Sequence, residues 1–274
     1  MTNLPTHDHL AVEHEDEILW LTFNRPDKLN CLRDDMLTVA CEIVDAIEND
    51  DSVRAVVISG AGRCFSTGYD ISPEVEMNRP QYSEPSRRFF KRRYALIDRI
   101  WNSPKPFIAS VHGYCLAAAS DIANVCDITI ASDDAEFGYP AVRWGGHTHR
   151  LTYPWHMPIK KAKELMFTGD RISAEEAHRI GMVNRVVPRD QLKEETRKFA
   201  KRICLIPQSG LAVNKISMNY AYNVQGYQQA MQYSFQIAET NLWRDEPFFQ
   251  KIREGGLNAA LDWRDGKFKE KAEG

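Results

Sequence analysis

The sequence predicts an α/β core followed by a helical region, and three observations lead to this prediction. The chain opens with an apolar strand pattern, an amphipathic helix and a second apolar strand, an order typical of parallel sheets. Short apolar strand patterns then recur as far as residue 137. From Tyr153 onward the apolar residues fall at helical spacing. We therefore assign residues 1–200 to the core and residues 201–274 to a C-terminal helical region.

The first elements follow from local patterns. Residues 18–23 predict a strand, and residues 24–27 predict a turn because proline fixes φ and Asn and Asp favour turns. Residues 32–49 carry apolar side chains at helical spacing, and residues 53–59 form an apolar run that predicts a buried strand. Residues 72–86 contain prolines and little apolar periodicity, so we expect a mobile loop there.

The later elements are predicted in the same way. A basic helix over residues 87–102 ends before two prolines, and Ser173 reads as the capping residue of a further helix. The remaining strands are expected at residues 106–111, 127–131 and 135–137. The remaining helices are expected at residues 119–125, 190–203, 208–242 and 246–263.

Composition narrows the function classes. The chain has 274 residues, enough for one large core, and its net charge of -3 indicates neither a nucleic-acid partner nor an anionic membrane surface. We see no apolar run long enough to span a membrane, and the polar, acidic N-terminus does not resemble a signal peptide. Six dispersed cysteines without a CxxC pair predict buried free thiols and a cytoplasmic location.

Two of the strand patterns end in small residues. Residues 56–60 lead into Phe65-Ser66-Thr67-Gly68-Tyr69-Asp70, and residues 106–111 lead through His112-Gly113 to a run of three alanines at 117–119. Small residues after a strand let a ligand approach the backbone, and at a helix start they leave N–H groups unpaired. Two such segments facing each other would form an oxyanion hole. The alternative is a tight packing point between strand and helix.

These segments resemble motifs of the crotonase family, the enoyl-CoA hydratase/isomerase superfamily. The resemblance covers nearly the whole chain and rests on residues 24–30, 65–70, 112–127 and 165–187, which stand in the family's order. It implies a crotonase-like core of ββα units wound into a superhelix, with an acyl-CoA substrate and a homotrimer or a dimer of trimers. Coenzyme A would be part of the substrate. No other cofactor is expected, because no GxGxxG follows the first strand.

The resemblance also implies site residues. The oxyanion donors would be the backbone N–H groups of Tyr69 and Ala118, which would bind a thioester oxygen as it gains charge toward an enolate. The further candidates are Ser66, Gly68, Asp70, Gly113 and Ala117 around this hole, Arg25 and Lys28 at the phosphates of CoA, and Tyr139 and Trp144 at the acyl group. Solvated surface charge is the alternative for the two cations, and ordinary core packing is the alternative for the aromatic residues.

The proton-transfer groups depart from the family pattern. Hydratases of this family use two glutamates, and this chain has Asp121 at the first position and Ala141 at the second. Because Ala141 cannot transfer a proton, we considered His147 and His149, which follow shortly after it, and expect one of them to pair with Asp121. The alternatives are a helix-terminal charge for Asp121 and loop hydrogen bonds for the two histidines.

Other chemistries fit the sequence less well. His147 and His149 could chelate zinc with His156 as a third ligand, but no HExxH motif or cysteine cluster supports such a site, so no metal is expected. No GxSxG surrounds Ser66 or Ser120. The sequence therefore predicts an enoyl-CoA hydratase/isomerase-like enzyme, a lyase that works through a stabilised enolate. The alternatives are a divergent CoA-ester hydrolase or isomerase, or a catalytically silent protein that binds CoA esters, because Ala141 replaces a glutamate.

Overall fold

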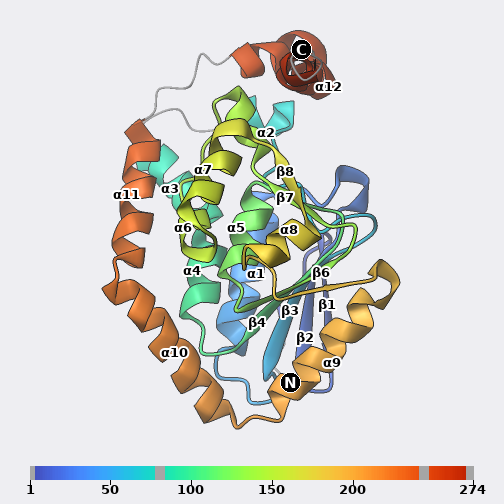
Figure 1. Cartoon of the computed structure of the whole chain (residues 1–274), viewed down its shortest axis with the longest axis vertical. Helices are drawn as coiled ribbons and strands as arrows, with labels where there is room; N and C mark the ends of the chain where they lie inside the picture. The colour runs from blue at the N-terminus through green and yellow to red at the C-terminus, as the bar shows by residue number, and fades with distance from the viewer. Residues whose placement is uncertain (1–3, 78–83, 241–246, 270–274) are drawn as a thin grey trace.

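A twisted six-stranded sheet organises the core of the computed structural model, which describes residues 4–77, 84–240 and 247–269 (Figure 1). The strand order is β1-β2-β3-β4-β6-β9. Only the β1–β2 pair is antiparallel, and every later pair is parallel. The strands are β1 (Leu10–Glu15), β2 (Ile18–Phe23), β3 (Ala55–Gly60), β4 (Phe107–Val111), β6 (Ile128–Ser132) and β9 (Arg185–Val187).

Helices cover both faces of this sheet, as a parallel sheet requires. One face packs in the main apolar core with α1 (Asp34–Ile47), α4 (Ala95–Asn102) and α5 (Ala118–Val125). The other face packs against α9 (Leu192–Cys204), with Trp20 and Ile130 among the buried residues between them. The predicted division at residue 200 falls inside α9, and α10 begins after the short connection that follows it.

A small second sheet lies beside the first and carries part of the site. It contains β5 (Tyr114–Leu116), β7 (Glu136–Gly138) and β8 (Arg171–Ser173), in that order. The remaining elements of the core are η1 (Pro26–Lys28), α2 (Pro73–Met77), α3 (Glu84–Arg93), η2 (Pro140–Trp144), α6 (Tyr153–His156), α7 (Ile159–Thr168), α8 (Ala174–Arg179) and η3 (Arg189–Gln191).

The C-terminal helices lie around the core in two ways. α10 (Gln208–Val224) and α11 (Tyr227–Thr240) run along one side of the molecule, and α12 (Pro247–Lys269) lies at one end of it (Figure 1). A buried lysine attaches α10: Lys215 Nζ donates to the carbonyl oxygens of Ile100 and Lys105 and to Asp127 Oδ2, at 2.8–2.9 Å. α12 is attached instead by an apolar cluster that includes Phe248 and Trp144.

Most predicted elements are present, with some corrections. The expected loop over residues 72–86 was wrong in part, because Pro73 starts α2 and Glu84 starts α3; residues 78–83 lie outside the described residues. The expected helix over residues 87–102 is interrupted at Tyr94, and the expected helix over residues 208–242 is divided near Gly226, whose φ is +102°. Ser173 caps α8 as predicted, since its Oγ accepts from Glu176 N–H at 3.2 Å.

Two further findings concern the described ranges only. No helix in them is both long and apolar enough to cross a lipid bilayer. All six cysteines are free thiols, and five of them are buried.

Candidate active site

The two small-residue segments lie side by side. Ser66 and Cys115 form an isolated parallel bridge, in which Ser66 N–H donates to Tyr114 O at 2.9 Å and Leu116 N–H donates to Ser66 O at 3.1 Å. This pairing brings the end of the β3 segment against the start of α5. Residues separated by about fifty positions in sequence therefore meet at one place, as the oxyanion-hole hypothesis requires.

Gly68 marks the closest approach between these segments. Its φ is +92°, and a Cβ there would lie 2.9 Å from Leu116 O and 3.2 Å from Ala118 N, so only glycine fits. Ala117 precedes the helix with φ +53° and ψ -125°, and its own N–H donates to Gly138 O at 2.9 Å. Ala118 N is therefore the first amide of α5 and lies beside Gly68.

The amide of Tyr69 is oriented by a bridge to Leu32. The flanking peptide groups are used there: Leu32 N–H donates to Gly68 O, and Asp70 N–H donates to Leu32 O. In a parallel bridge the central residue directs its own N–H away from that partner. Tyr69 N–H consequently points away from Leu32. The side chain of Tyr69 is fixed by a hydrogen bond from its hydroxyl to Arg93 O at 3.0 Å.

Two predicted contact residues have a clear local role. Ser66 is fully buried, and its Oγ accepts from Gly68 N–H at 3.2 Å, which shapes the turn before Tyr69. Gly113 has φ +53°, and a Cβ there would lie 2.4 Å from Arg63 O. This glycine therefore permits the close approach of the segments that contain Arg63 and Gly113. For both residues a direct contact with substrate stays a prediction.

The two predicted phosphate-binding cations differ in their surroundings. The Arg25 side chain is largely buried and forms an ion pair with Asp70 at 3.0 Å, while it also donates to Cys31 O at 2.8 Å. Asp70 Oδ1 in turn accepts from Ser72 N–H at 2.9 Å. Arg25 and Asp70 thus stabilise the loop that carries Tyr69. Lys28 is exposed.

Asp121 is a fully buried carboxyl group on the first turn of α5. Its hydrogen bonds run to threonines: Oδ1 lies 2.8 Å from Thr152 Oγ1, and Oδ2 lies 3.1 Å from Thr148 Oγ1. Burial raises the pKa of Asp121 to about 7, and the two threonine contacts offset part of this rise. A carboxyl group with such a pKa can exchange a proton near neutral pH.

The two histidines flank Thr148, the threonine that contacts Asp121, but their rings are held by other partners. His149 is buried, stacks on Phe90 with ring centroids 4.1 Å apart, and its Nδ1 lies 3.2 Å from Tyr94 OH. The His147 ring stacks on His149 at 5.1 Å. Thr148, between them, makes the contact with Asp121. Direct pairing of Asp121 with either histidine stays a prediction.

Ala141, where the sequence analysis expects the second family glutamate, lies in an apolar cluster. Ala141 packs with Trp144 and with residues of α12, and Trp144 stacks on Phe248 with centroids 5.0 Å apart. Phe249 meets the same indole edge-on at 5.2 Å. Ile71, directly after the Tyr69 loop, belongs to this cluster as well. α12 therefore covers Ala141 and the neighbouring Trp144.

The predicted aromatic residues fall on both sides of Asp121. Tyr139 is buried, and its phenol interacts with Asp121 and with Thr148, while burial raises its pKa well above the usual value. Trp144 belongs to the α12 cluster. Neither assignment as an acyl contact has been tested, so both stay predictions.

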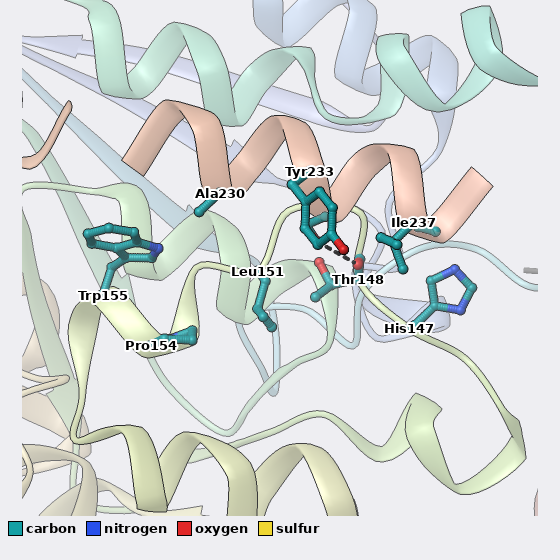
Figure 2. A pocket seen from close by; sticks show the side chains of 10 residues that line it. His147, Thr148, Leu151, Pro154, Trp155, Ala230, Tyr233 and Ile237 are labelled. Atoms are coloured by element: carbon teal, nitrogen blue, oxygen red, sulfur yellow. Dashed lines mark hydrogen bonds between the residues drawn. The ribbon is translucent and has the colours of Figure 1, made fainter. Parts of the chain in front are cut away.

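A cavity of about 800 Å³ opens beside the histidine segment. Figure 2 shows Ala230, Tyr233 and Ile237 of α11 on one side of it and His147, Leu151 and Trp155 on the other. Its lining is mostly apolar, and Thr148 forms part of the wall. Within the described ranges, no group of three or more His, Cys, Asp or Glu side chains is placed to hold a metal ion.

Sequence reasoning missed three features of this site. Thr148 and Thr152 bond Asp121 from 27 and 31 residues away, and their only sequence signal is a pair of threonines flanking the segment that begins at His149. The third is the aromatic pair Phe248-Phe249, whose two adjacent phenylalanines stand out in a polar stretch.

Comparisons with known proteins agree with one another. Residues 13–271 match the family model described as enoyl-CoA hydratase/isomerase. A short-chain-enoyl-CoA hydratase from Clostridium acetobutylicum is 36% identical over 218 residues, covering 77% of this chain and 81% of that protein. A crotonyl-CoA hydratase from Syntrophomonas wolfei is 33% identical over 219 residues, covering 78% and 82%. The crystal structure of an enoyl-CoA hydratase/isomerase from Xanthobacter autotrophicus Py2 superimposes with a TM-score of 0.91 at 36% identity, covering 96% and 99%.

Proposed function

This chain belongs to the enoyl-CoA hydratase/isomerase family, with the crotonase fold, and we propose that it converts an acyl-CoA thioester through an enolate. It is an enzyme of that family in the lyase class. Its relatives are named for enoyl-CoA and crotonyl-CoA hydration. Coenzyme A enters as part of the substrate, and we propose no other cofactor.

We propose that Tyr69 N–H and Ala118 N–H bind the thioester oxygen. The observation that carries this proposal is the contact of the two segments at Gly68, where a Cβ would lie 3.2 Å from Ala118 N. The first amide of a helix has no acceptor within the helix, and Tyr69 N–H is directed away from its Leu32 bridge. Two amides aimed at one oxygen stabilise the charge that develops there, and one such donor typically contributes a factor of roughly 10²–10³ in rate.

Asp121 supplies the proton-transfer group in this proposal. It lies three residues after Ala118 on the same helix, so both belong to the first turn of α5. The opposite side of the site offers Ala141 and aromatic rings in place of a second carboxylate. The chemistry that remains is one proton transfer at an enolate, which isomerisation, decarboxylation and C–C cleavage share with hydration.

A second candidate is a different reaction of a CoA ester, or binding without turnover. The apolar cluster around Ala141 favours it, since hydration needs a group that activates water. The complete burial of Asp121 favours it as well.

For the nucleotide end of the substrate we propose Lys28 as the phosphate contact. Its side chain is exposed, whereas Arg25 is already paired with Asp70. Arg25 would then act on binding through the loop that it stabilises.

We also propose a homotrimer or a dimer of trimers. The support is the number of large apolar side chains that α10 and α11 expose. They are Val213, Ile216, Met218, Tyr220, Val224, Tyr233 and Ile237, each at least half exposed. A surface of this kind is typical of contacts between subunits. The free cysteines support a reducing compartment, and we propose the cytoplasm.

The test is turnover of a short and a bulky enoyl-CoA, followed by loss of the enone-thioester absorbance. We expect wild type to consume one of them and Asp121→Ala to lose activity. Asp45→Ala, which removes an exposed carboxylate paired with Arg99, is the control for removal of an acidic side chain. Tight binding of both esters without turnover would shift the assignment to the second candidate.

A further inference from the structure

Tyr69 is held both through its backbone and through its side chain, and one short segment of the chain takes part in both. At the backbone, the peptide groups on the two sides of Tyr69 are bonded to Leu32. Asp34, two residues after Leu32, begins α1 and pairs with Arg93, whose guanidinium group packs on the Tyr69 ring. The contacts around Tyr69 therefore form a closed circuit that passes through its peptide groups and through its side chain.

Arg93 is a buried cation, and its ionic partner among the described residues is Asp34. Only 5% of Arg93 is exposed, and its Nε donates to Asp34 Oδ1 at 2.7 Å. The guanidinium carbon lies 4.9 Å from the centre of the Tyr69 ring and 4.2 Å from the centre of the Phe89 ring. A planar guanidinium group stacks on aromatic faces better than an ammonium group does. The ion pair and the two rings thus fix the direction of the Arg93 side chain.

The main chain of Arg93 contacts Tyr69 as well. Arg93 ends α3, where the last carbonyl groups lack donors within the helix, and its oxygen accepts from Tyr69 OH at 3.0 Å. The interruption between α3 and α4 at Tyr94 also brings the Tyr94 ring edge-on to the Tyr69 ring, with centroids 5.6 Å apart. The Tyr69 side chain is consequently held at its hydroxyl group by the main chain of Arg93 and on its ring by the Arg93 side chain.

A second ion pair on the same helix offers a comparison. Arg99 on α4 pairs with Asp45 on α1, and both of its hydrogen bonds go to that carboxylate, at 2.8 and 2.9 Å. The Arg99 side chain is 36% exposed, and an exposed pair of this kind contributes little to stability. Arg93 therefore differs from Arg99 in its burial and in its contact with Tyr69, while both are joined to α1.

We propose that Arg93 is a positioning residue of the oxyanion hole: paired with Asp34, it holds the Tyr69 side chain and thereby fixes the direction of the Tyr69 N–H. Arg93 itself does not touch the substrate. The effect on turnover rests on the proposed function, in which this N–H binds the thioester oxygen. An amide stabilises a developing charge only while it is aimed at it, so loss of Arg93 acts on the transition state and leaves substrate binding almost unchanged.

Hydrogen–deuterium exchange of the substrate-free protein tests the positioning without any turnover. Arg93→Met keeps most of the length of the side chain and removes its charge. We expect it to speed exchange in residues 66–72, because the peptide groups around Tyr69 would open more often. Arg99→Met is the matched control and should leave exchange in this segment unchanged. Unchanged exchange in a folded Arg93→Met protein would overturn the proposal.

Kinetics with an enoyl-CoA that wild type consumes separate positioning from binding. We expect Arg93→Met to lower kcat by roughly 10- to 100-fold with KM within about twofold of wild type, and Arg99→Met to change neither. Arg93→Lys keeps a charge beside Asp34 but loses the planar stacking, so it should restore part of the lost kcat. A raised KM with unchanged kcat would make Arg93 a substrate contact and overturn the proposal.

Two further variants decide the question if Arg93→Met does not fold. Asp34→Asn leaves Arg93 without its ionic partner, and Tyr69→Phe removes the hydroxyl group that donates to Arg93 O but keeps the backbone amide. Both should speed exchange in residues 66–72 and lower kcat. The double variant should be no slower than the more affected single variant, because both changes act through one set of contacts. Unchanged exchange and kcat in both single variants would overturn the proposal.

The two measurements also distinguish this proposal from the proposed function. Faster exchange in Arg93→Met, together with a wild type that turns over no enoyl-CoA, would fail the proposed function and leave the positioning of Tyr69 intact. Turnover by wild type that Arg93→Met retains in full, with unchanged exchange, would do the reverse.

Discussion

The first turn of α5 and the η2 segment hold the two positions that the sequence analysis assigns to the family's carboxylates, Asp121 and Ala141, and their surroundings have opposite character. Around Asp121 the neighbours are hydroxyl groups, with Thr148 and Thr152 at 3.1 and 2.8 Å. Around Ala141 the neighbours are carbon atoms of Trp144 and of the aromatic residues of α12. One side of the site is a buried carboxyl group with hydroxyl partners, and the other side is an apolar cluster. Asp121 therefore stands in this site without a second carboxylate at position 141.

The largest expected effect is the pH dependence of the free energy of unfolding, and it comes from Asp121. The pKa of Asp121 is raised to about 7 in the folded state from about 3.8 when unfolded, so the folded protein binds one more proton between these values. The contribution of Asp121 to the free energy of unfolding is fully present below pH 4 and is lost as the pH rises to 7, by about 4 kcal/mol in total. Urea unfolding of wild type and Asp121→Asn at several pH values measures it. We expect the variant to gain stability relative to wild type up to pH 7 and no further.

The next effect concerns the backbone contact between Gly68 and the start of α5. Gly68→Ala places a methyl group 2.9 Å from Leu116 O and Ala117 Cβ, which separates the two segments. We expect turnover to fall by roughly 10²–10³, as for loss of one oxyanion donor. Gly181→Ala is the matched control, because Gly181 also has a positive φ, +85°, but has no neighbour within 4 Å of the added atom. Equal losses of activity in the two variants would show that backbone strain alone is responsible.

The smallest effect tests the apolar side directly. Ala141→Glu places a carboxyl group among Trp144, Phe248 and the other cluster residues, where it is expected to take up a proton. A neutral polar group buried without a hydrogen bond typically costs about 1–3 kcal/mol in proteins. Thermal unfolding should show a lower midpoint for this variant, whereas Ala259→Glu, on an exposed position of α12, should not. An Ala141→Glu protein as stable as wild type would mean that α12 does not hold this cluster closed.

Much of the fold could be predicted because hydrophobic periodicity is a local signal. The strand at residues 18–23, the α1 helix and the capping of α8 by Ser173 are as predicted. β1 was not recognised, since only Leu10 of its six residues is buried and its pattern is weak. α2 was missed because a five-residue helix that begins at Pro73 is too short to show periodicity.

The contact between the two small-residue segments could be predicted, because it depends on the backbone. Small residues at the ends of two strands led us to expect two segments that face each other, and in the structure a Cβ on Gly68 would lie 2.9 Å from Ala117 Cβ. The partners of Asp121 were not predictable, because a hydroxyl group that bonds a distant carboxyl group leaves no pattern in sequence. The histidines at 147 and 149 drew attention by their chemistry, while the threonine between them makes the contact.

Ala117 has φ +53° with ψ -125°, a conformation that glycine adopts freely and alanine does not. A residue in such a region typically raises the energy of the folded state by about 1–3 kcal/mol, and the surrounding hydrogen bonds must hold it there. Ala117 N–H does so by donating to Gly138 O of the second sheet. Glycine at this position would relax the peptide and make the protein more stable, but it would also let the following amide swing. The strained backbone of Ala117 thus fixes the direction of the peptide group that carries the Ala118 N–H.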